Sequence, residues 1–313
     1  MTDRAFSGWP PPALDPAGPF AEGVEGLSWA LLAMGAIVSL IVFVALGLAL
    51  FGPRSWRKRL GSGWMILGAG LAFPAVVIGA FLVLGLRDMR DLTGPAPPGE
   101  MRVRIVGEMW WWRVVYLDAE GRELFHDANE LVLPVGRPVT LELESADVVH
   151  SFWVPRLAGK VDMVPGRRNL MRVQADQAGA FGGQCAEYCG GPHALMGLVV
   201  VARPAAEFDA WMAGQTAPRT PVPHPGAEVF RSSGCGACHT IRGTEANGLA
   251  GPDLTRVGAR RTLGAGILPN NAGTLGGWIS DSQAIKPGNR MPAYPMLTRP
   301  ELRAVVEYLD GLQ

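Results

Sequence analysis

The chain has 313 residues, with 28 basic and 28 acidic side chains and a hydrophobic content of 48%. Nothing in its zero net charge suggests nucleic-acid binding, and its length allows two or three domains. The apolar residues are concentrated in two uncharged stretches, 27–51 and 60–86. Because a membrane helix needs about 20 apolar residues, we predict a transmembrane hairpin over 27–86, with helices at 27–51 and 62–86 and a loop at 52–61.

The charges that flank these stretches predict how the hairpin lies in the membrane. The loop carries Arg54, Arg57, Lys58 and Arg59 and no acidic residue, whereas the tail at 1–26 has more acidic than basic residues. By the positive-inside rule, the loop faces the cytoplasm. We therefore expect a two-helix protein of the bacterial inner membrane, whose N-terminal tail and later domains are periplasmic.

Short runs that alternate apolar and polar residues follow the hairpin, and Gly and Pro separate them. This pattern predicts an antiparallel β-sandwich or barrel, which we place in an all-β domain at 87–212. A linker rich in Pro and Thr at 213–225 leads to an all-α domain at 226–313. The last helix of that domain should begin with a capping box formed by Thr298 and Glu301.

The segment QCAEYCGGPHALM brings together Cys185, Cys189, His193 and Met196. Thiolate and thioether sulfurs are soft ligands and imidazole is borderline, a combination that suits copper. A copper electron-transfer site takes a further histidine from a distant strand, and His150 in ADVVHSFWVP is the candidate. Because one copper ion does not need both cysteines, the set favours two bridged copper ions, while zinc or a periplasmic disulfide remains an alternative.

The other cysteine pair lies in SGCGACHTI, where Cys235, Cys238 and His239 form CxxCH, the attachment motif of c-type haem. The thiols bind the haem vinyl groups and the histidine binds the iron. A methionine as sixth ligand raises the reduction potential, and Met291 and Met296 in KPGNRMPAYPML are the candidates. A redox disulfide between the two cysteines is the alternative.

Three segments, GEMWWWRVVY, DVVHSFWVPRLAGKVDMVPGRRN and GGQCAEYCGGPHALMGLVV, together with the hairpin, resemble subunit II of the haem–copper oxidases over residues 24–202. The resemblance implies a cupredoxin fold that holds the dinuclear copper centre CuA. In that family two cysteines bridge the ions, two histidines bind one ion each, and a methionine and a backbone carbonyl complete the two ions. The matching ligands here are Cys185, Cys189, His150, His193, Met196 and the carbonyl of Glu187.

The same resemblance implies two further roles. Trp110 stands where the family passes electrons into CuA, although an aromatic run is also ordinary in a strand or near a membrane surface. Glu187 and Asp162 stand where the family faces subunit I, and the glutamate there helps to hold a magnesium ion, which prefers oxygen ligands. Acidic residues in loops are, equally, often only solvated.

The last domain, 226–313, resembles the class I cytochromes c. This resemblance places the axial methionine at Met291 rather than at Met296. It also implies that the carbonyl of Pro252, in GPDL, accepts a hydrogen bond from His239 and so orients the ring.

Together the resemblances imply a multidomain subunit II with a fused cytochrome c, as in caa3-type cytochrome c oxidases. Electrons would enter at haem c, pass to CuA and leave to haem a of subunit I, which reduces oxygen to water and pumps protons. Expected partners are subunit I with its haem–copper centre, subunit III, the lipid membrane, and a soluble cytochrome c or another small periplasmic redox protein. The alternatives are a CuA-containing nitric oxide reductase subunit and a membrane-tethered electron carrier without a catalytic partner.

Overall fold

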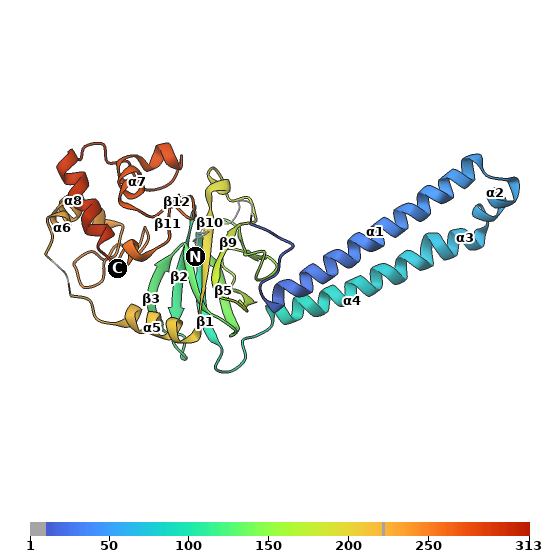
Figure 1. Cartoon of the computed structure of the whole chain (residues 1–313), viewed down its shortest axis with the longest axis horizontal. Helices are drawn as coiled ribbons and strands as arrows, with labels where there is room; N and C mark the ends of the chain where they lie inside the picture. Colours follow the sequence, from blue (N-terminus) through green and yellow to red (C-terminus); the bar gives the residue numbers. More distant parts are fainter. Residues whose placement is uncertain (1–10, 221–222) are drawn as a thin grey trace.

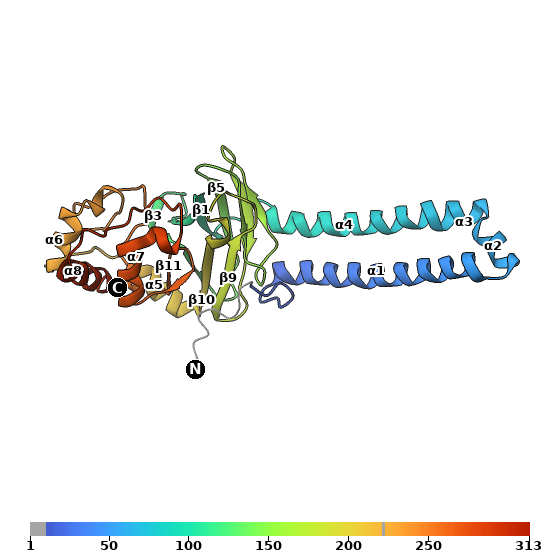
Figure 2. The same cartoon turned by 90° about the horizontal axis from the view of Figure 1, so that it is seen from above.

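The structure is a computed structural model that describes residues 11–220 and 223–313. A helical hairpin, a β-sandwich and a small helical domain follow one another along the chain (Figure 1). The hairpin projects from one end of the sandwich, and the helical domain packs on the opposite side (Figures 1 and 2). Residues 1–10 of the predicted tail and 221–222 of the predicted linker lie outside the described residues.

The hairpin consists of two long helical segments that run side by side (Figure 2). Both are long and apolar enough to cross a membrane. They extend beyond the predicted spans at the end nearest the sandwich, because helical hydrogen bonding continues past the apolar stretch. The predicted loop is largely helical, since Arg, Lys and Leu favour helix. The elements are α1 (Pro19–Phe51), α2 (Arg54–Leu60), α3 (Gly63–Leu67), a π-helical turn (Gly68–Ala72) and α4 (Phe73–Thr93).

The π-helical turn at Gly68–Ala72 has a local cause. Pro74 lies in the first turn of α4, and a proline inside a helix lacks the N–H donor and clashes with the carbonyl four residues earlier. A wider turn directly before the proline accommodates that clash without ending the helix.

Two five-stranded sheets make up the sandwich. The first contains, in spatial order, β3 (Glu123–Ala128), β2 (Trp111–Leu117), β1 (Met101–Glu108), β5 (Val139–Ser145) and β8 (Asn169–Val173). The second contains β4 (Glu130–Pro134), β10 (Gly197–Arg203), β9 (Gly179–Cys185), β6 (His150–Trp153) and β7 (Val161–Met163). The helix α5 (Ala205–Thr216) follows β10.

Each sheet contains one parallel pair, β1 with β5 and β4 with β10, so the expectation of a wholly antiparallel sandwich is wrong at these positions. The chain leaves the first sheet after β3, forms β4 in the second sheet, and returns as β5 beside β1. A crossing between sheets lets neighbouring strands run in the same direction. The alternation of apolar and polar residues along a strand does not predict the direction of its neighbours.

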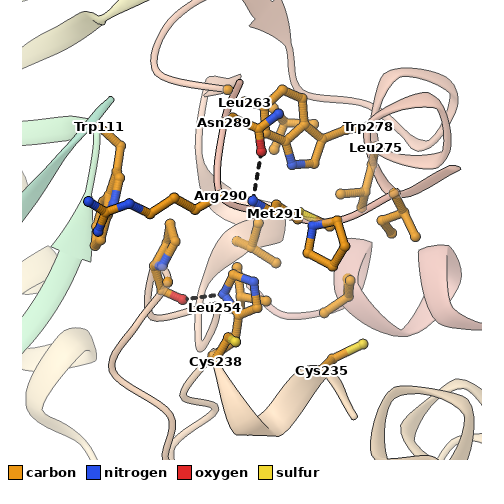
Figure 3. A pocket seen from close by; sticks show the side chains of 18 of the residues that line it. Trp111, Cys235, Cys238, Leu254, Leu263, Leu275, Trp278, Asn289, Arg290 and Met291 are labelled. Atoms are coloured by element: carbon orange, nitrogen blue, oxygen red, sulfur yellow. Dashed lines mark hydrogen bonds between the residues drawn. The ribbon is translucent and has the colours of Figure 1, made fainter. Parts of the chain in front are cut away.

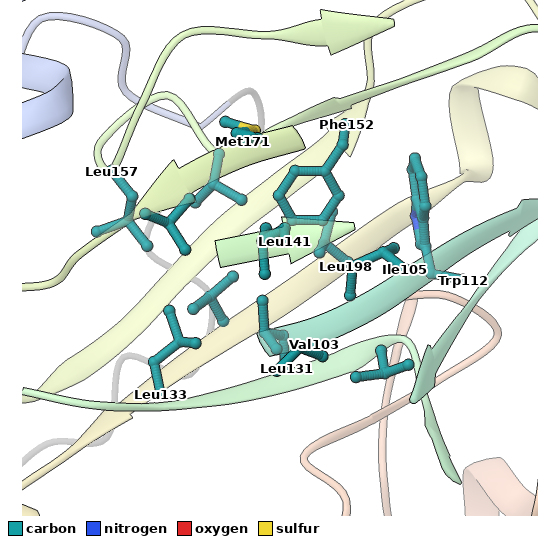
Figure 4. Close-up of a cluster of buried hydrophobic side chains, with 14 of the residues drawn as sticks. Val103, Ile105, Trp112, Leu131, Leu133, Leu141, Phe152, Leu157, Met171 and Leu198 are labelled. Atoms are coloured by element: carbon teal, nitrogen blue, oxygen red, sulfur yellow. The ribbon is translucent and has the colours of Figure 1, made fainter. Parts of the chain in front are cut away.

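Large side chains with at most 1% exposure fill the space between the sheets (Figure 4). The first sheet contributes Ile105, Trp112 and Leu141, and the second contributes Leu131, Phe152 and Leu198. The rings of Trp112 and Phe152 meet edge to face at 5.7 Å, a favourable geometry for two aromatic rings. This core fixes β6, the strand that begins with His150.

The helical domain packs two short helices against each other very closely. A Cβ atom at Gly226 would lie 1.9 Å from the carbonyl oxygen of Ala304, so only glycine fits there. The predicted capping box of Thr298 and Glu301 is present. The elements are α6 (Pro225–Ser232), β11 (Thr262–Leu263), β12 (Leu268–Pro269), α7 (Ala272–Ile285) and α8 (Arg299–Asp310).

Candidate metal centres on either side of a domain boundary

Neighbouring strands of the second sheet bring the candidate copper ligands together. His150 begins β6 and Cys185 ends β9, and these strands pair so that Phe152 lies opposite Cys185. The loop from β9 to β10 supplies the remaining residues, including His193 in a short 3-10 helix and Met196 directly before β10. His150, both cysteines and Met196 are at most 5% exposed, so the cluster is shielded from water.

The ligand atoms form two groups around two sulfur atoms. Cys185 Sγ and Cys189 Sγ are 3.7 Å apart, well beyond the bond length of about 2.05 Å in a disulfide. Each sulfur has one imidazole nitrogen and one further ligand atom beside it, which is more than one tetrahedral zinc ion needs and suits two soft ions. The neighbours are His150 Nδ1 at 3.8 Å and the Glu187 carbonyl oxygen at 3.1 Å from Cys185, and His193 Nδ1 at 3.4 Å and Met196 Sδ at 3.7 Å from Cys189.

Asp147, which we did not predict from the sequence, sets the orientation of His150. Its Oδ1 atom lies 2.9 Å from His150 Nε2, so that Nδ1 is the nitrogen that faces Cys185. The backbone N–H groups of Met109 and Val148 donate to the carboxylate and hold it in place. A carboxylate behind a ligating histidine fixes its tautomer and raises its basicity. The spacing Asp-x-x-His was the signal available in the sequence.

Burial and hydrogen bonding shift the pKa values of three of these groups. Burial opposes the charged form of His150, but hydrogen bonds with Cys185 and Asp147 outweigh it and raise the pKa of His150. The hydrogen bond between the two cysteines lowers the pKa of Cys185 and raises the pKa of Cys189. Because thiolate is the metal-binding form of cysteine, this shift favours Cys185 as a metal ligand.

The second candidate site is an apolar cavity of about 340 Å³ in the helical domain, with Cys235, Cys238 and His239 in its wall (Figure 3). All four cysteines of the chain are free thiols in the structure. His239 Nδ1 lies 2.8 Å from the carbonyl oxygen of Pro252. Because a carbonyl only accepts, Nδ1 carries the proton and Nε2 is left to bind a metal. Burial lowers the pKa of His239, which favours the neutral, ligating ring. These features fit a covalently attached haem.

Only one of the two candidate methionines lies in this cavity. Met291 lines it, and its backbone N–H donates to Asn289 Oδ1 at 2.8 Å (Figure 3). Its carbonyl accepts hydrogen bonds from the side chains of Ser282 and Gln283. Met296 is 69% exposed. The fold therefore fixes Met291 against the cavity and leaves Met296 in solvent.

The β-sandwich closes one side of the cavity. The sandwich residues in the cavity wall are Glu108, Met109, Trp110, Trp111 and Asn129. The indole Nε1 of Trp110 donates to the carbonyl of Cys189 at 2.9 Å. A single side chain therefore touches the loop at 186–196 between β9 and β10, called the copper loop below, and borders the cavity of the helical domain on its other side.

Several polar contacts cross the same boundary, and none of them was predicted from the sequence. They join residues far apart in the sequence, so no local pattern predicts them. Three of these contacts are Lys286 Nζ to the Trp110 carbonyl at 2.6 Å, Arg113 to the Leu249 carbonyl at 2.7 Å, and Arg260 to Asp127 at 2.8 Å.

The two acids that the sequence places towards a partner lie together at the surface. Lys160 Nζ is 2.9 Å from Asp162 Oδ1 and 3.8 Å from Glu187 Oε2. The hydrogen bond from Lys160 lowers the pKa of Asp162. All three side chains are close to half exposed, so another chain could reach both carboxylates.

Known proteins resemble the chain along nearly its whole length. A family model for the "Cytochrome C oxidase subunit II, periplasmic domain" matches residues 117–203, and one for "Cytochrome c" matches 224–313. Cytochrome c oxidase subunit 2 of Alkalihalophilus pseudofirmus is 35% identical over 96% of this chain and 90% of that protein. The chain belongs to the cytochrome c oxidase subunit II family.

The chain is also similar to two further proteins. Cytochrome c oxidase subunit 2 of Bacillus subtilis is 30% identical, over 82% of this chain and 75% of that protein. The crystal structure of the periplasmic domain of subunit II (CoxB) of Bradyrhizobium japonicum is 30% identical, and the match covers 39% of this chain and 96% of that one with a TM-score of 0.36.

Family membership confirms several expectations from the sequence. The chain is a membrane-anchored subunit II of a haem–copper oxidase, with a copper site in its β-sandwich, haem c in its helical domain, and subunit I as its partner. The cupredoxin-like sandwich and the cytochrome c domain are confirmed as well.

Proposed function

We propose that this chain is the electron-entry subunit of a proton-pumping cytochrome c oxidase in a bacterial inner membrane. Electrons enter at haem c, pass to a dinuclear CuA centre, and leave to haem a of subunit I, where oxygen is reduced to water. The haem and the copper pair supply the redox chemistry, while the chain binds them, sets their spacing and shields them from water. Subunit III and a soluble cytochrome c, or another small periplasmic donor, complete the system.

The position of Trp110 carries this proposal. Its indole donates to the Cys189 carbonyl, and the same residue lines the cavity beside Cys235, Cys238 and His239. Electron transfer between two cofactors needs them close together in a fixed arrangement. Here one rigid aromatic side chain, that of Trp110, lies between the two sites. This supports Trp110 as the residue through which electrons reach the copper pair.

The proposed ligands follow the geometry of the two sites. Asp147 holds the His150 ring with Nδ1 towards the sulfurs, and Pro252 holds the His239 ring with Nε2 towards the cavity. The copper pair would be held by Cys185 and Cys189 as bridges, with His150, His193, Met196 and the carbonyl of Glu187 as the remaining ligands. The haem would be held by Cys235 and Cys238 through thioethers, and by His239 and Met291 at the iron.

The face of Asp162 and Glu187 would meet subunit I. Both carboxylates are accessible, and Lys160 between them neutralises part of their charge. We assign the side chain of Glu187 to a magnesium ion at that interface, because a carboxylate oxygen is a ligand that magnesium prefers.

Substitution of one bridging thiol tests the order of electron flow. In the complete oxidase, Cys189→Ser should leave haem c attached and rapidly reduced by the donor, because CxxCH lies in another domain. Reduction of haem a and oxygen uptake should fall more than about 100-fold, beyond the range usual for residues that only orient a ligand. Ala186→Ser, in the same loop, is the control and should keep normal rates. Normal oxygen uptake by copper-depleted Cys189→Ser would disprove this order.

A further inference from the structure

Lys286 is a buried cation with an unusual set of partners. It directly follows α7 and is only 2% exposed. Its ammonium donates to the carbonyls of Trp110 at 2.6 Å, Leu195 at 2.8 Å and Gly264 at 3.0 Å. Among the residues that the structure describes, no carboxylate forms an ion pair with it. The three protons of the ammonium thus have three acceptors, all of them backbone carbonyls.

The three carbonyls belong to the segments that meet at the domain boundary. Trp110 lies in the connection from β1 to β2, and Leu195 lies in the copper loop between His193 and Met196. Gly264 lies at the tip of the hairpin from β11 to β12. One side chain of the helical domain therefore holds the two sandwich segments that border the copper cluster.

The hairpin tip adds a second contact beside Lys286. Gly264, Ala265 and Gly266 all have positive φ, and Ala265 at 69° adopts a conformation that is uncommon for a residue with a Cβ. The Ala265 carbonyl accepts a hydrogen bond from Gly197 N–H at 3.0 Å, and Ala265 is 1% exposed. The tip is thus shaped to fit the end of the copper loop.

Burying the charge of Lys286 costs free energy, which suggests that its three hydrogen bonds have a purpose. Burying an ammonium is unfavourable without hydrogen-bond partners, and burial lowers the pKa of Lys286, whereas its three carbonyl acceptors favour the charged form. An apolar side chain of similar length would fill the same space without that penalty. What it could not do is bind three carbonyls of three separate segments in one geometry.

We propose that Lys286 is a positioning residue for electron transfer, which locks the haem domain onto the Trp110 segment and the copper loop. The contact itself is independent of the activity, but its role in transfer rests on the function proposed above. Lys286 would act by keeping the haem cavity and the copper ligands in one fixed relation, and it would not touch either cofactor's reacting atoms.

The test uses the complete oxidase with Lys286→Met, which keeps the length of the side chain and removes its charge. The KM for the donor should be unchanged, while kcat and the rate of transfer from haem c to copper should fall at least about tenfold, equivalent to about 1.4 kcal/mol. Hydrogen exchange of the backbone amides at 107–112 and 190–198 should become faster. Lys286→Arg, which keeps a charged donor, should recover part of both losses.

Arg303→Met is the matched control, because it removes one exposed positive charge from α8 of the same domain and should change nothing. Should Lys286→Met fail to assemble, Lys286→Gln, which removes the charge but keeps two N–H donors, gives the same comparison. Unchanged transfer together with unchanged exchange in the Lys286 variants would overturn the proposal. If the unaltered protein showed no electron transfer from haem c to copper, the proposed function would be refuted. The hydrogen-exchange measurement would still test whether Lys286 holds the two domains together.

Discussion

Arg260 Nε donates a hydrogen bond of 2.8 Å to Oδ1 of Asp127, which lies in the other domain 133 residues earlier. The two side chains are only 8% and 12% exposed. Solvent screens such a pair weakly, and removal of one member would leave the other charge buried without its partner. This buried pair is therefore one of the contacts that attach the haem domain, together with those of Lys286 and Arg113.

Asp127→Asn should destabilise the helical domain by about 3 kcal/mol, at the lower end for a broken buried pair because the amide oxygen can still accept a hydrogen bond. The measurement is denaturant unfolding of the full chain, followed by haem absorbance. Glu228→Gln, which breaks an exposed pair with Arg231 on α6, should leave the transition unchanged. Coincident curves for Asp127→Asn and the unaltered protein would contradict the prediction.

Glu130 should make stability depend on pH. Burial and the nearby charge of Asp127 raise the pKa of Glu130 from 4.5 to about 7. The folded state holds the proton on the Glu130 carboxyl more tightly than the unfolded chain does. The contribution of Glu130 to the free energy of unfolding is therefore largest below about pH 4.5, and it declines as the pH rises to about 7. Relative to Glu130→Gln, the unaltered protein should lose about 3 kcal/mol between pH 4 and pH 8. Glu207→Gln, on exposed α5, should show no such difference in unfolding measurements.

Asp147→Asn should weaken copper binding. The variant keeps the shape of the side chain but loses the charge that favours the present orientation of His150. Loss of a residue that orients a metal ligand lowers affinity by about 10–100-fold, which a titration with a competing chelator would measure. Asp209→Asn, at an exposed site, is the control. Equal copper affinities in the two variants would argue against the orienting role.

Met291 and Met296 should differ sharply. Met291→Leu should lower the midpoint potential of haem c by on the order of 0.1 V or more, within the span of about 0.8 V that axial ligands cover. Met296→Leu should leave it unchanged, because that side chain is 69% exposed. Potentiometric titration of haem absorbance measures both. A fall in potential only in Met296→Leu would reverse the assignment.

The features that could be predicted from the sequence are those whose signal lies in neighbouring residues. CxxCH, the copper loop, the apolar spans and the capping box of Thr298 are all local patterns. The crossing of the chain between sheets, the buried pair of Asp127 and Arg260, and the three contacts of Lys286 join distant segments. In the sequence, Lys286 resembles any lysine near a helix end. Only its burial against three carbonyls distinguishes it.

The β-sandwich forms one wall of the haem cavity, and this bears on the order in which cofactors are inserted and the domains close. Haem is a rigid macrocycle, and once Trp110 and Trp111 close one side of the cavity, its route from that side is shut. The copper cysteines are only 5% and 3% exposed, and Lys286 holds the neighbouring Leu195. We therefore expect haem attachment and copper delivery to precede closure of the two domains, which would make that closure a late step of maturation.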